Sequence, residues 1–244
     1  MNTHPRVYAM IVAAGRGSRF GASVSKQYSM LQGQTLLQHS VARLARSAYI
    51  SDFFLVVAAD DSTAQTLDFA LPVQYAIGGA ERWQSVRAGV EAIVEAGADK
   101  DDLILIHDAA RPAVPCNDID QVIDAARLEA YGAILATPVA DTLKLSTSIS
   151  QSKPMYESTL HDYVERTIDR HNMWQAQTPQ VFRVAQLRHV LSYVAEHQLN
   201  ITDESSAFEH LNLPIRLVSG SRQNIKLTYP DDAILLAAIL AAQK

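Results

Sequence analysis

The stretch Val7-Tyr8-Ala9-Met10-Ile11-Val12-Ala13, which runs directly into Ala14-Gly15-Arg16-Gly17-Ser18-Arg19-Phe20-Gly21, decides the fold. An apolar run without polar alternation is typical of a strand that is buried on both faces of a parallel sheet. The glycines that follow let backbone N–H groups approach a ligand closely, and the arginines add positive charge. The stretch therefore predicts a central strand that ends in an anion-binding loop.

Apolar runs and helical patterns alternate after this strand. The spacing of apolar residues predicts strands over 53–59, 73–77, 103–106, 133–137 and 215–218, and helices over 36–46, 83–95, 119–131, 184–197 and 203–211. Gly132 is expected to end the third of these helices, Thr202 to cap the fifth, and Pro230 to open a final helix. The order predicts an α/β fold, with a mostly parallel Rossmann-like sheet flanked by helices in a single domain over 1–244.

One segment breaks this alternation. From about 139 to 173 the chain is polar and poorly periodic. A structureless run of this length is uncommon inside a compact domain. We therefore interpret it as an arm that leaves the body of the protein, either as a lid or as a dimer contact.

The charge distribution is uneven. The first 51 residues carry six cations and no carboxylate, whereas the whole chain has a net charge of −5. A cation-rich loop without counter-charges predicts a site for a polyanion, and a nucleoside triphosphate is the simplest one. The alternative is an ordinary turn with solvated arginines. The negative total argues against general binding of nucleic acid, which favours a basic surface.

The cysteine count and the hydropathy indicate in which cellular compartment the protein is located. The lone Cys116 cannot form an intrachain disulfide, which favours a reducing compartment. The N-terminus lacks the apolar core of a signal peptide, and no apolar run is long enough to span a bilayer. We expect a cytoplasmic protein with no membrane partner.

Three clusters follow the carboxyl ends of predicted strands, namely Ala13–Lys26, Gly78–Arg82 and His107–Pro112. Ligands of open parallel sheets bind beyond these ends. Asp108 can bind a ribose hydroxyl, hold Mg²⁺ beside a phosphate, or pair with Arg111 to fix the turn. His107 is expected to be a packed side chain.

The first loop matches neither of two common nucleotide motifs. Phe20 replaces the last glycine of G-x-G-x-x-G, and no Gly-Lys-Ser/Thr follows. No Ser/His/Asp or Cys/His set is recognisable either. A phosphate nucleophile would need no base, since its second pKa is about 6. Catalysis would then consist of positioning two anions and neutralising charge.

These motifs resemble known families. Ala13-Ala14-Gly15-x-Gly17-x-Arg19-x-Gly21 with Lys26-Gln27 resembles the opening of nucleotidyltransferases that join a sugar phosphate to a nucleotide. The later motifs together resemble the 2-C-methyl-D-erythritol 4-phosphate cytidylyltransferase family of the non-mevalonate isoprenoid pathway: His107-Asp108-Ala109-Ala110-Arg111-Pro112, Asp141-Thr142, Thr178-Pro179-Gln180, Ile201-Thr202-Asp203-Glu204 and Asn224-Ile225-Lys226. Ribitol-5-phosphate cytidylyltransferase has a similar layout, and Ala110 favours the erythritol family.

The resemblance implies a reaction and a set of roles. The phosphate of 2-C-methyl-D-erythritol 4-phosphate would attack the α-phosphorus of CTP, giving CDP-methylerythritol and pyrophosphate. The implied catalytic cations are Arg19, Lys26, Arg170 and Lys226. The implied substrate-binding residues are Ala13, Ala14, Gly15, Gly17, Gly79, Arg82, Ser85, Asp108, Arg111 and Thr142. Mg²⁺ would be held mainly by the nucleotide phosphates, with no dedicated protein metal site.

The resemblance also implies a homodimer, because the family's arm reaches into the partner subunit's site. Thr142 and Arg170 would lie on that arm. Two departures stand out: Ala80 occupies a position where the family often has an acidic residue, and the arm is longer than usual. Two other classes remain open. One is an oxidoreductase with a variant nucleotide loop, disfavoured by Phe20; the other is a nucleotide-binding regulator without activity.

Overall fold

The computed structural model describes residues 4–15, 25–153 and 156–243. The chain divides into two compact units. We call Met1–Ala136 together with Ala176–Lys244 the body, and Thr137–Gln175 the arm. The expected arm segment, 139–173, falls inside the second unit.

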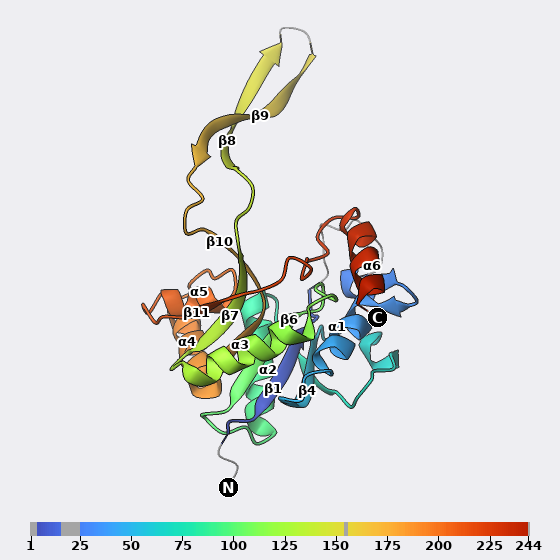
Figure 1. The fold of residues 1–244 in the computed structure, drawn as a ribbon. Coiled ribbons are helices and arrows are strands. Elements are labelled where there is room, and N and C mark those ends of the chain that lie inside the picture. Colours follow the sequence, from blue (N-terminus) through green and yellow to red (C-terminus); the bar gives the residue numbers. More distant parts are fainter. Residues whose placement is uncertain (1–3, 16–24, 154–155, 244) are drawn as a thin grey trace. The chain divides into compact units, whose positions relative to one another are not determined.

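The described elements alternate between strands and helices for most of the chain (Figure 1). In chain order they are β1 Val7–Val12, the 3₁₀ turn η2 Lys26–Tyr28, β2 Met30–Leu31, β3 Gln34–Thr35, α1 Leu36–Leu44, β4 Ile50–Val57, the 3₁₀ turn η3 Ala64–Thr66, β5 Gln74–Ile77, α2 Arg82–Glu95, β6 Leu103–Asp108, α3 Cys116–Leu128, β7 Gly132–Pro138, β8 Leu143–Lys153, β9 Tyr156–Ile168, β10 Trp174–Arg183, α4 Val184–Glu196, α5 Glu204–Glu209, β11 Arg216–Ser219 and α6 Asp232–Ala242. Among the described helices, none is long and apolar enough to cross a membrane.

The central sheet has seven strands in the order β11-β7-β10-β6-β1-β4-β5. β1 pairs in parallel with both β4 and β6, which confirms the mostly parallel α/β fold. β10 runs antiparallel to β6 and was not predicted. Three of its polar residues, Gln177, Thr178 and Gln180, are buried, and each makes a hydrogen bond that compensates for its burial.

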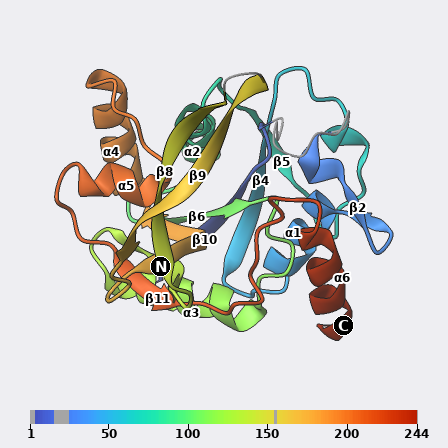
Figure 2. The ribbon, with the colours of Figure 1, turned by 90° about the horizontal axis from the view of Figure 1, so that it is seen from above.

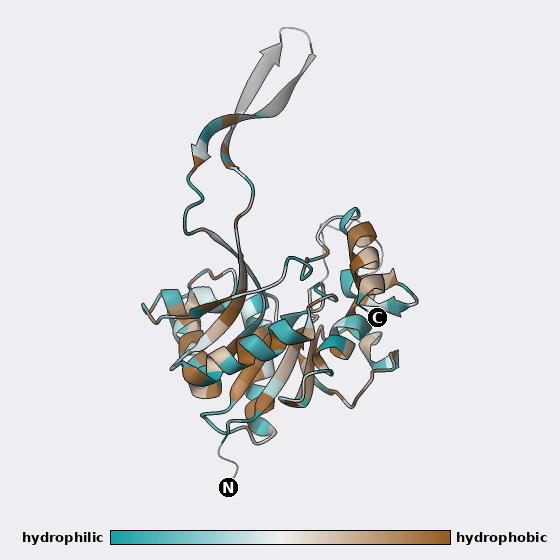
Figure 3. Cartoon of the chain, in the orientation of Figure 1, coloured by the Kyte–Doolittle hydropathy of each residue, from teal (hydrophilic) through white to brown (hydrophobic). Residues whose placement is uncertain are grey.

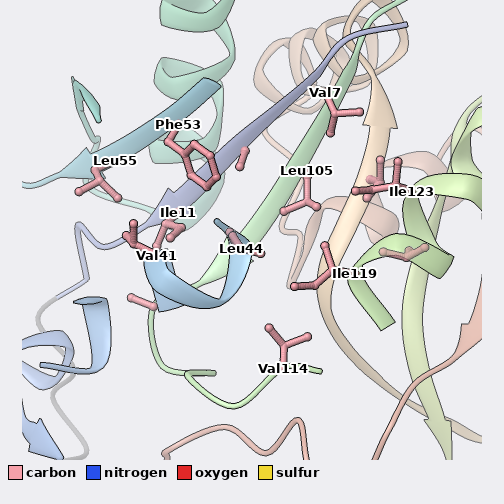
Figure 4. Close-up of a cluster of buried hydrophobic side chains, with 14 of the residues drawn as sticks. Val7, Ile11, Val41, Leu44, Phe53, Leu55, Leu105, Val114, Ile119 and Ile123 are labelled. Carbon is pink, nitrogen blue, oxygen red and sulfur yellow. The ribbon is translucent and has the colours of Figure 1, made fainter. Parts of the chain in front are cut away.

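The central strand packs on both faces, as its unbroken apolar run predicts. Val7 and Ile11 join a cluster with residues of α1 and α3, shown in Figure 4. Tyr8 and Met10 point to the other face, where α2, α4 and α5 cover the sheet. Figure 2 shows the helices on the two sides, and Figure 3 shows that the apolar residues concentrate in the strands between them. β1 is therefore buried on both of its faces as far as its carboxyl end.

Two predicted helix ends were wrong. Helix α3 ends before Glu129, and Gly132 instead begins β7. A Cβ atom at Gly132 would lie 2.2 Å from the carbonyl oxygen of Val181, so the close approach of β10 requires glycine there. At α5 the cap is Asp203 rather than Thr202, because the Asp203 side chain accepts a hydrogen bond from the Ser206 N–H group.

The arm is a β-hairpin rather than a structureless segment. β8 and β9 pair antiparallel from Leu143 opposite Ile168 to Lys153 opposite Tyr156. The described side chains of the hairpin are mostly exposed, so neither face imposes the apolar alternation that marks a half-buried strand. The pattern therefore missed both strands.

Candidate active site

The carboxyl ends of β1 and β6 meet at one edge of the sheet. Val12 pairs with Asp108 in the parallel register, so the loop after β1 begins beside the Asp108 carboxylate. A cavity of about 170 Å³ opens there. Its described lining comes from the ends of both strands, from η2 and from the segment before α6: Val12, Ala13, Gly15, Lys26, Gln27, Asp108, Ala109, Ala110 and Lys226. Two of the predicted clusters thus share one cavity.

Asp108 lies between two cations. Its Oδ2 atom accepts a hydrogen bond of 2.7 Å from Lys226, and its Oδ1 atom lies 3.4 Å from a guanidinium nitrogen of Arg82. Burial opposes ionisation of this carboxyl, but Arg82 and Lys226 outweigh it and hold the pKa well below its usual range. The alternative prediction, in which Asp108 pairs with Arg111, is wrong: among the described residues, the ion pairs of Asp108 are with Arg82 and Lys226.

Arg82 forms a second ion pair with a buried carboxylate. The same guanidinium nitrogen lies 2.9 Å from Oε2 of Glu204, a fully buried residue at the start of α5. Burial raises the pKa of Glu204, and the charge of Arg82 works against that rise. In the sequence, Glu204 stands out only as the last residue of the Ile201–Glu204 motif, and no pattern there links it to Arg82.

A hydrogen-bonded relay fixes the backbone at Asp108. The Asp108 N–H group donates to Oγ1 of Thr178 at 3.0 Å, and Thr178 Oγ1 lies 3.0 Å from Nδ1 of His107. Because Nε2 of His107 must donate to the carbonyl oxygen of Arg111, Nδ1 accepts the Thr178 hydroxyl proton. Burial lowers the pKa of His107 to about 4, so the ring is neutral and serves as a support, as expected from the sequence.

Arg111 is held by backbone carbonyls. Its guanidinium donates to the carbonyl oxygens of Asn224, at 2.6 Å, and Ala176, at 3.4 Å. The buried Asn224 amide in turn donates to Gln177 and to the carbonyl oxygen of Thr178. These contacts fasten the segment that carries Lys226 to β10.

The other wall of the cavity is fixed by η2. Lys26 donates to the carbonyl oxygen of Leu227 at 2.6 Å, and Gln27 donates to that of Ala13 at 2.8 Å. The Leu227 N–H group donates to the carbonyl oxygen of Ala110. Lys26 and Lys226 are therefore placed on one cavity although 200 residues separate them in the sequence.

The third predicted cluster packs against the loop after β1. A Cβ atom at Gly78 would lie 2.6 Å from Cβ of Ala14 and 2.7 Å from Oγ of Ser85, so only glycine allows this approach. The Ser85 hydroxyl accepts from the Gly79 N–H group at 3.2 Å. Ala14, Gly79 and Ser85 are thus neighbours, which is the arrangement that a base-binding wall would need.

Comparisons with known proteins place this geometry in a family. The family model of 2-C-methyl-D-erythritol 4-phosphate cytidylyltransferase (IspD) matches residues 7–242. The chain belongs to this family. Proteins of that name from Psychrobacter arcticus and Psychrobacter cryohalolentis are 69% and 68% identical to it, covering 100% of this chain and 94% and 95% of their own. A crystal structure of 4-diphosphocytidyl-2C-methyl-D-erythritol synthase shares 34% identity at a TM-score of 0.79, with 97% of this chain and 99% of that chain covered.

The structure of this cytidylyltransferase family member places most of the predicted site residues. Ala13, Gly15, Lys26, Asp108 and Lys226 line the cavity, and Arg82 contacts Asp108. Gly17 and Arg19 lie outside the described residues. Thr142 and Arg170 belong to the arm, where both are exposed.

Sequence reasoning overstated the group of unpaired cations near the N-terminus. Arg6 forms an ion pair of 2.8 Å with Asp52, so it does not belong to a polyanion site. Reasoning from the sequence also missed the supporting roles of Gln27, Thr178 and Glu204. The Lys26-Gln27, Thr178-Pro179-Gln180 and Ile201–Glu204 motifs marked these positions without giving their partners.

Proposed function

We propose that this protein transfers the cytidylyl group of CTP to 2-C-methyl-D-erythritol 4-phosphate in non-mevalonate isoprenoid biosynthesis. A phosphate oxygen of the acceptor forms a bond to the α-phosphorus of CTP. The bond from that phosphorus to the bridging oxygen of the β-phosphate breaks, and pyrophosphate leaves. The observation that carries this proposal is the cavity at the end of β1, which Lys26, Lys226 and Asp108 line together.

The described side chains support a reaction without a protein base. The acceptor phosphate is largely ionised at neutral pH, because its second pKa is about 6. His107, the titratable ring beside the cavity, is buried and has both nitrogens in hydrogen bonds. Lys26 would neutralise the triphosphate together with Arg19, which lies outside the described residues, and Lys226 would place the acceptor phosphate. Such preorganised charge often contributes more to catalysis than any other single effect.

We propose Mg²⁺ as the metal of the reaction. Among the described residues, no group of three or more His, Cys, Asp or Glu side chains is arranged to hold a metal ion. Mg²⁺ is commonly bound by one or two carboxylates together with substrate phosphates, and Asp108 on the cavity wall fits that requirement. When bound, Mg²⁺ would neutralise charge on the triphosphate, with Asp108 as its carboxylate on the protein.

Ala13, Ala14, Gly79 and Ser85 are proposed to hold the cytosine. These residues are small, and a purine would need more room between them than a pyrimidine. Ala80 carries no acidic group to read the base, so we expect CTP to exceed ATP and GTP clearly and UTP by less. Single-turnover rates with the four nucleotides measure this order, and equal rates with ATP would contradict the proposed pocket.

The arm is proposed to complete the site of a second copy in a two-fold dimer. An isolated two-stranded hairpin is at best marginally stable in water, and the exposed Val164 and Tyr163 on β9 offer apolar contacts. A two-fold dimer would make the exchange reciprocal, so that each site received Thr142 and Arg170 from its partner. The free Cys116 and the CTP substrate favour the cytoplasm as its location.

Pyrophosphate release with CTP and a panel of acceptors tests the proposed function. The panel contains 2-C-methyl-D-erythritol 4-phosphate, ribitol 5-phosphate, erythritol 4-phosphate and glycerol 3-phosphate. We expect rapid release with the first alone. Faster release with ribitol 5-phosphate would assign a ribitol-5-phosphate cytidylyltransferase, and CTP binding without release from any acceptor would indicate a regulator.

A further inference from the structure

A buried ion pair lies behind the cavity and outside its lining. Glu204 is fully buried, and its Oε2 atom holds Arg82 at 2.9 Å. Its other oxygen, Oε1, is buried without a hydrogen-bond partner among the described residues. An unsatisfied buried polar atom costs about 1–3 kcal/mol, and more when the group is charged. Replacing buried ion pairs by apolar residues is often neutral or stabilising, so stability alone does not explain this glutamate.

The position of Glu204 is set by the same strand that sets Asp108. Gln180 of β10 donates to the Asp203 carboxylate at 2.8 Å and accepts from the Ser205 N–H group at 3.3 Å, so it grips both neighbours of Glu204. Two residues earlier, Thr178 accepts from the Asp108 N–H group. The Thr178-Pro179-Gln180 motif therefore fixes both ends of the chain of contacts from Glu204 through Arg82 to Asp108.

The two distances of Arg82 are unequal. One guanidinium nitrogen lies 2.9 Å from Glu204 and 3.4 Å from Asp108. Without the carboxylate of Glu204, Asp108 would be the nearest negative charge to Arg82, and a closer ion pair would form. That pair would occupy Oδ1 of Asp108, while Lys226 already occupies Oδ2. The carboxylate on the cavity wall would then have both oxygens tied to cations and less capacity left for a substrate hydroxyl or a metal.

We propose that Glu204 is a positioning residue for cytidylyl transfer, holding Arg82 back so that the Asp108 carboxylate stays available to the nucleotide. The inference rests on the proposed function, because it assigns Asp108 to the substrate side of the cavity. Glu204 itself does not line that cavity and acts only through Arg82.

A double-mutant cycle tests this role. We expect Glu204→Gln to lower kcat/KM for CTP by about 10- to 100-fold, the usual loss when a supporting partner is removed. Arg82→Gln removes the group that Glu204 controls. If Glu204 acts through Arg82, the double variant keeps the kcat/KM of Arg82→Gln within about twofold, since interacting sites are not additive. Glu209→Gln, on the exposed side of the same short helix, is the matched control and should equal the wild type.

The outcomes separate a positioning role from a structural one. All rates are measured well below the thermal midpoint of each variant. A Glu204→Gln variant that loses thermal stability but keeps kcat/KM within about threefold of wild type would overturn the inference, and so would a further loss of about tenfold in the double variant relative to Arg82→Gln. If Glu204→Gln does not fold, the double variant, which buries no unpaired charge, decides by the same comparison with Arg82→Gln. Wild-type protein that releases no pyrophosphate would overturn the proposed function and this inference together.

Discussion

The body and the arm hold their functional residues in different ways. In the body, Asp108, Arg82 and Arg111 each have partners in their own unit, and a buried core lies behind them. In the arm, Ser148 bonds to Asp162 and Lys144 to Thr167 between exposed strands. Residues of the body are therefore placed by the folded chain itself. Thr142 and Arg170 are exposed and need a surface outside the arm to become part of a site.

The largest expected effect comes from two variants, one with a substitution in the body and one with a substitution in the arm. Lys26→Ala in the body and Arg170→Ala in the arm should each leave a nearly inactive enzyme, because removing a donor aimed at developing charge costs about 10²–10³ in rate. If the arm works in trans, a mixed dimer has one site with both lesions and one with neither. Random remixing makes about half of the dimers mixed, so about a quarter of all sites are restored. Cytidylyl transfer after co-refolding the two variants measures the recovery.

Two controls accompany that experiment. Each variant is refolded alone, and the mixed dimers are verified by a tag on one of the two chains. No recovery in verified mixed dimers would place Arg170 in the site of its own chain or outside any site. Lys26→Ala protein that turns over within about threefold of wild type would remove the η2 lysine from the mechanism.

Truncating a core leucine tests the buried core that supports the site in the body. Leu105, at the centre of β6, is fully buried in the cluster beneath α1 and α3. Leu105→Ala should lower the free energy of unfolding by about 2–5 kcal/mol, because it removes apolar contacts and leaves a cavity. Urea denaturation followed by circular dichroism measures the loss. Leu128→Ala is the control, since Leu128 is 80% exposed, and a similar loss there would contradict the assigned core.

His107 should make the body sensitive to mild acid. Burial lowers its pKa to about 4, whereas an unfolded histidine titrates near pH 6.5. Below pH 6.5 the unfolded chain gains a proton that the folded chain does not, so this contribution to stability is present above pH 6.5 and is lost towards pH 4. The expected loss is about 2 kcal/mol between pH 7 and pH 5.

Comparing wild type with His107→Gln isolates this effect. Glu204 acts in the opposite direction, because burial raises its pKa and the folded chain then binds a proton more readily than the unfolded chain. The urea midpoint of His107→Gln should therefore fall less than that of wild type between pH 7 and pH 5. Parallel curves for the two proteins would show that His107 is protonated in the folded state.

The smallest expected effect lies in the arm. Ser148 donates to Asp162 at 2.5 Å, but both side chains are exposed, so water replaces the hydrogen bond easily. Ser148→Ala should change the free energy of unfolding by no more than about 0.5 kcal/mol. Urea denaturation at several protein concentrations measures this change. A loss above about 1 kcal/mol would show that this part of the hairpin is covered rather than exposed.

The local sequence determined the helices and strands whose burial follows a regular pattern of apolar residues. The sequence predicted the apolar run of β1, the periodicity of α1 and α4, and Asp108 at the end of β6. It could do so because the spacing of apolar residues within each element indicates which of its residues are buried. The motifs also indicated the family, which the comparisons confirmed over residues 7–242. Helix ends were harder to predict from the sequence. Gly132, for example, is required by its close contact with β10, a strand that comes much later in the chain.

Only the tertiary structure decided which charges meet. Arg82 and Glu204 are 122 residues apart, and Asp108 and Lys226 are 118 apart. Periodicity reports whether a side chain faces the core, but it carries no information on which strand crosses between two others. β10 enters antiparallel beside β6, buries its polar residues through hydrogen bonds, and so brings α5 and its glutamate to Arg82. The charged groups could therefore be identified from the sequence, whereas the order of strands in the sheet determined which of them form pairs.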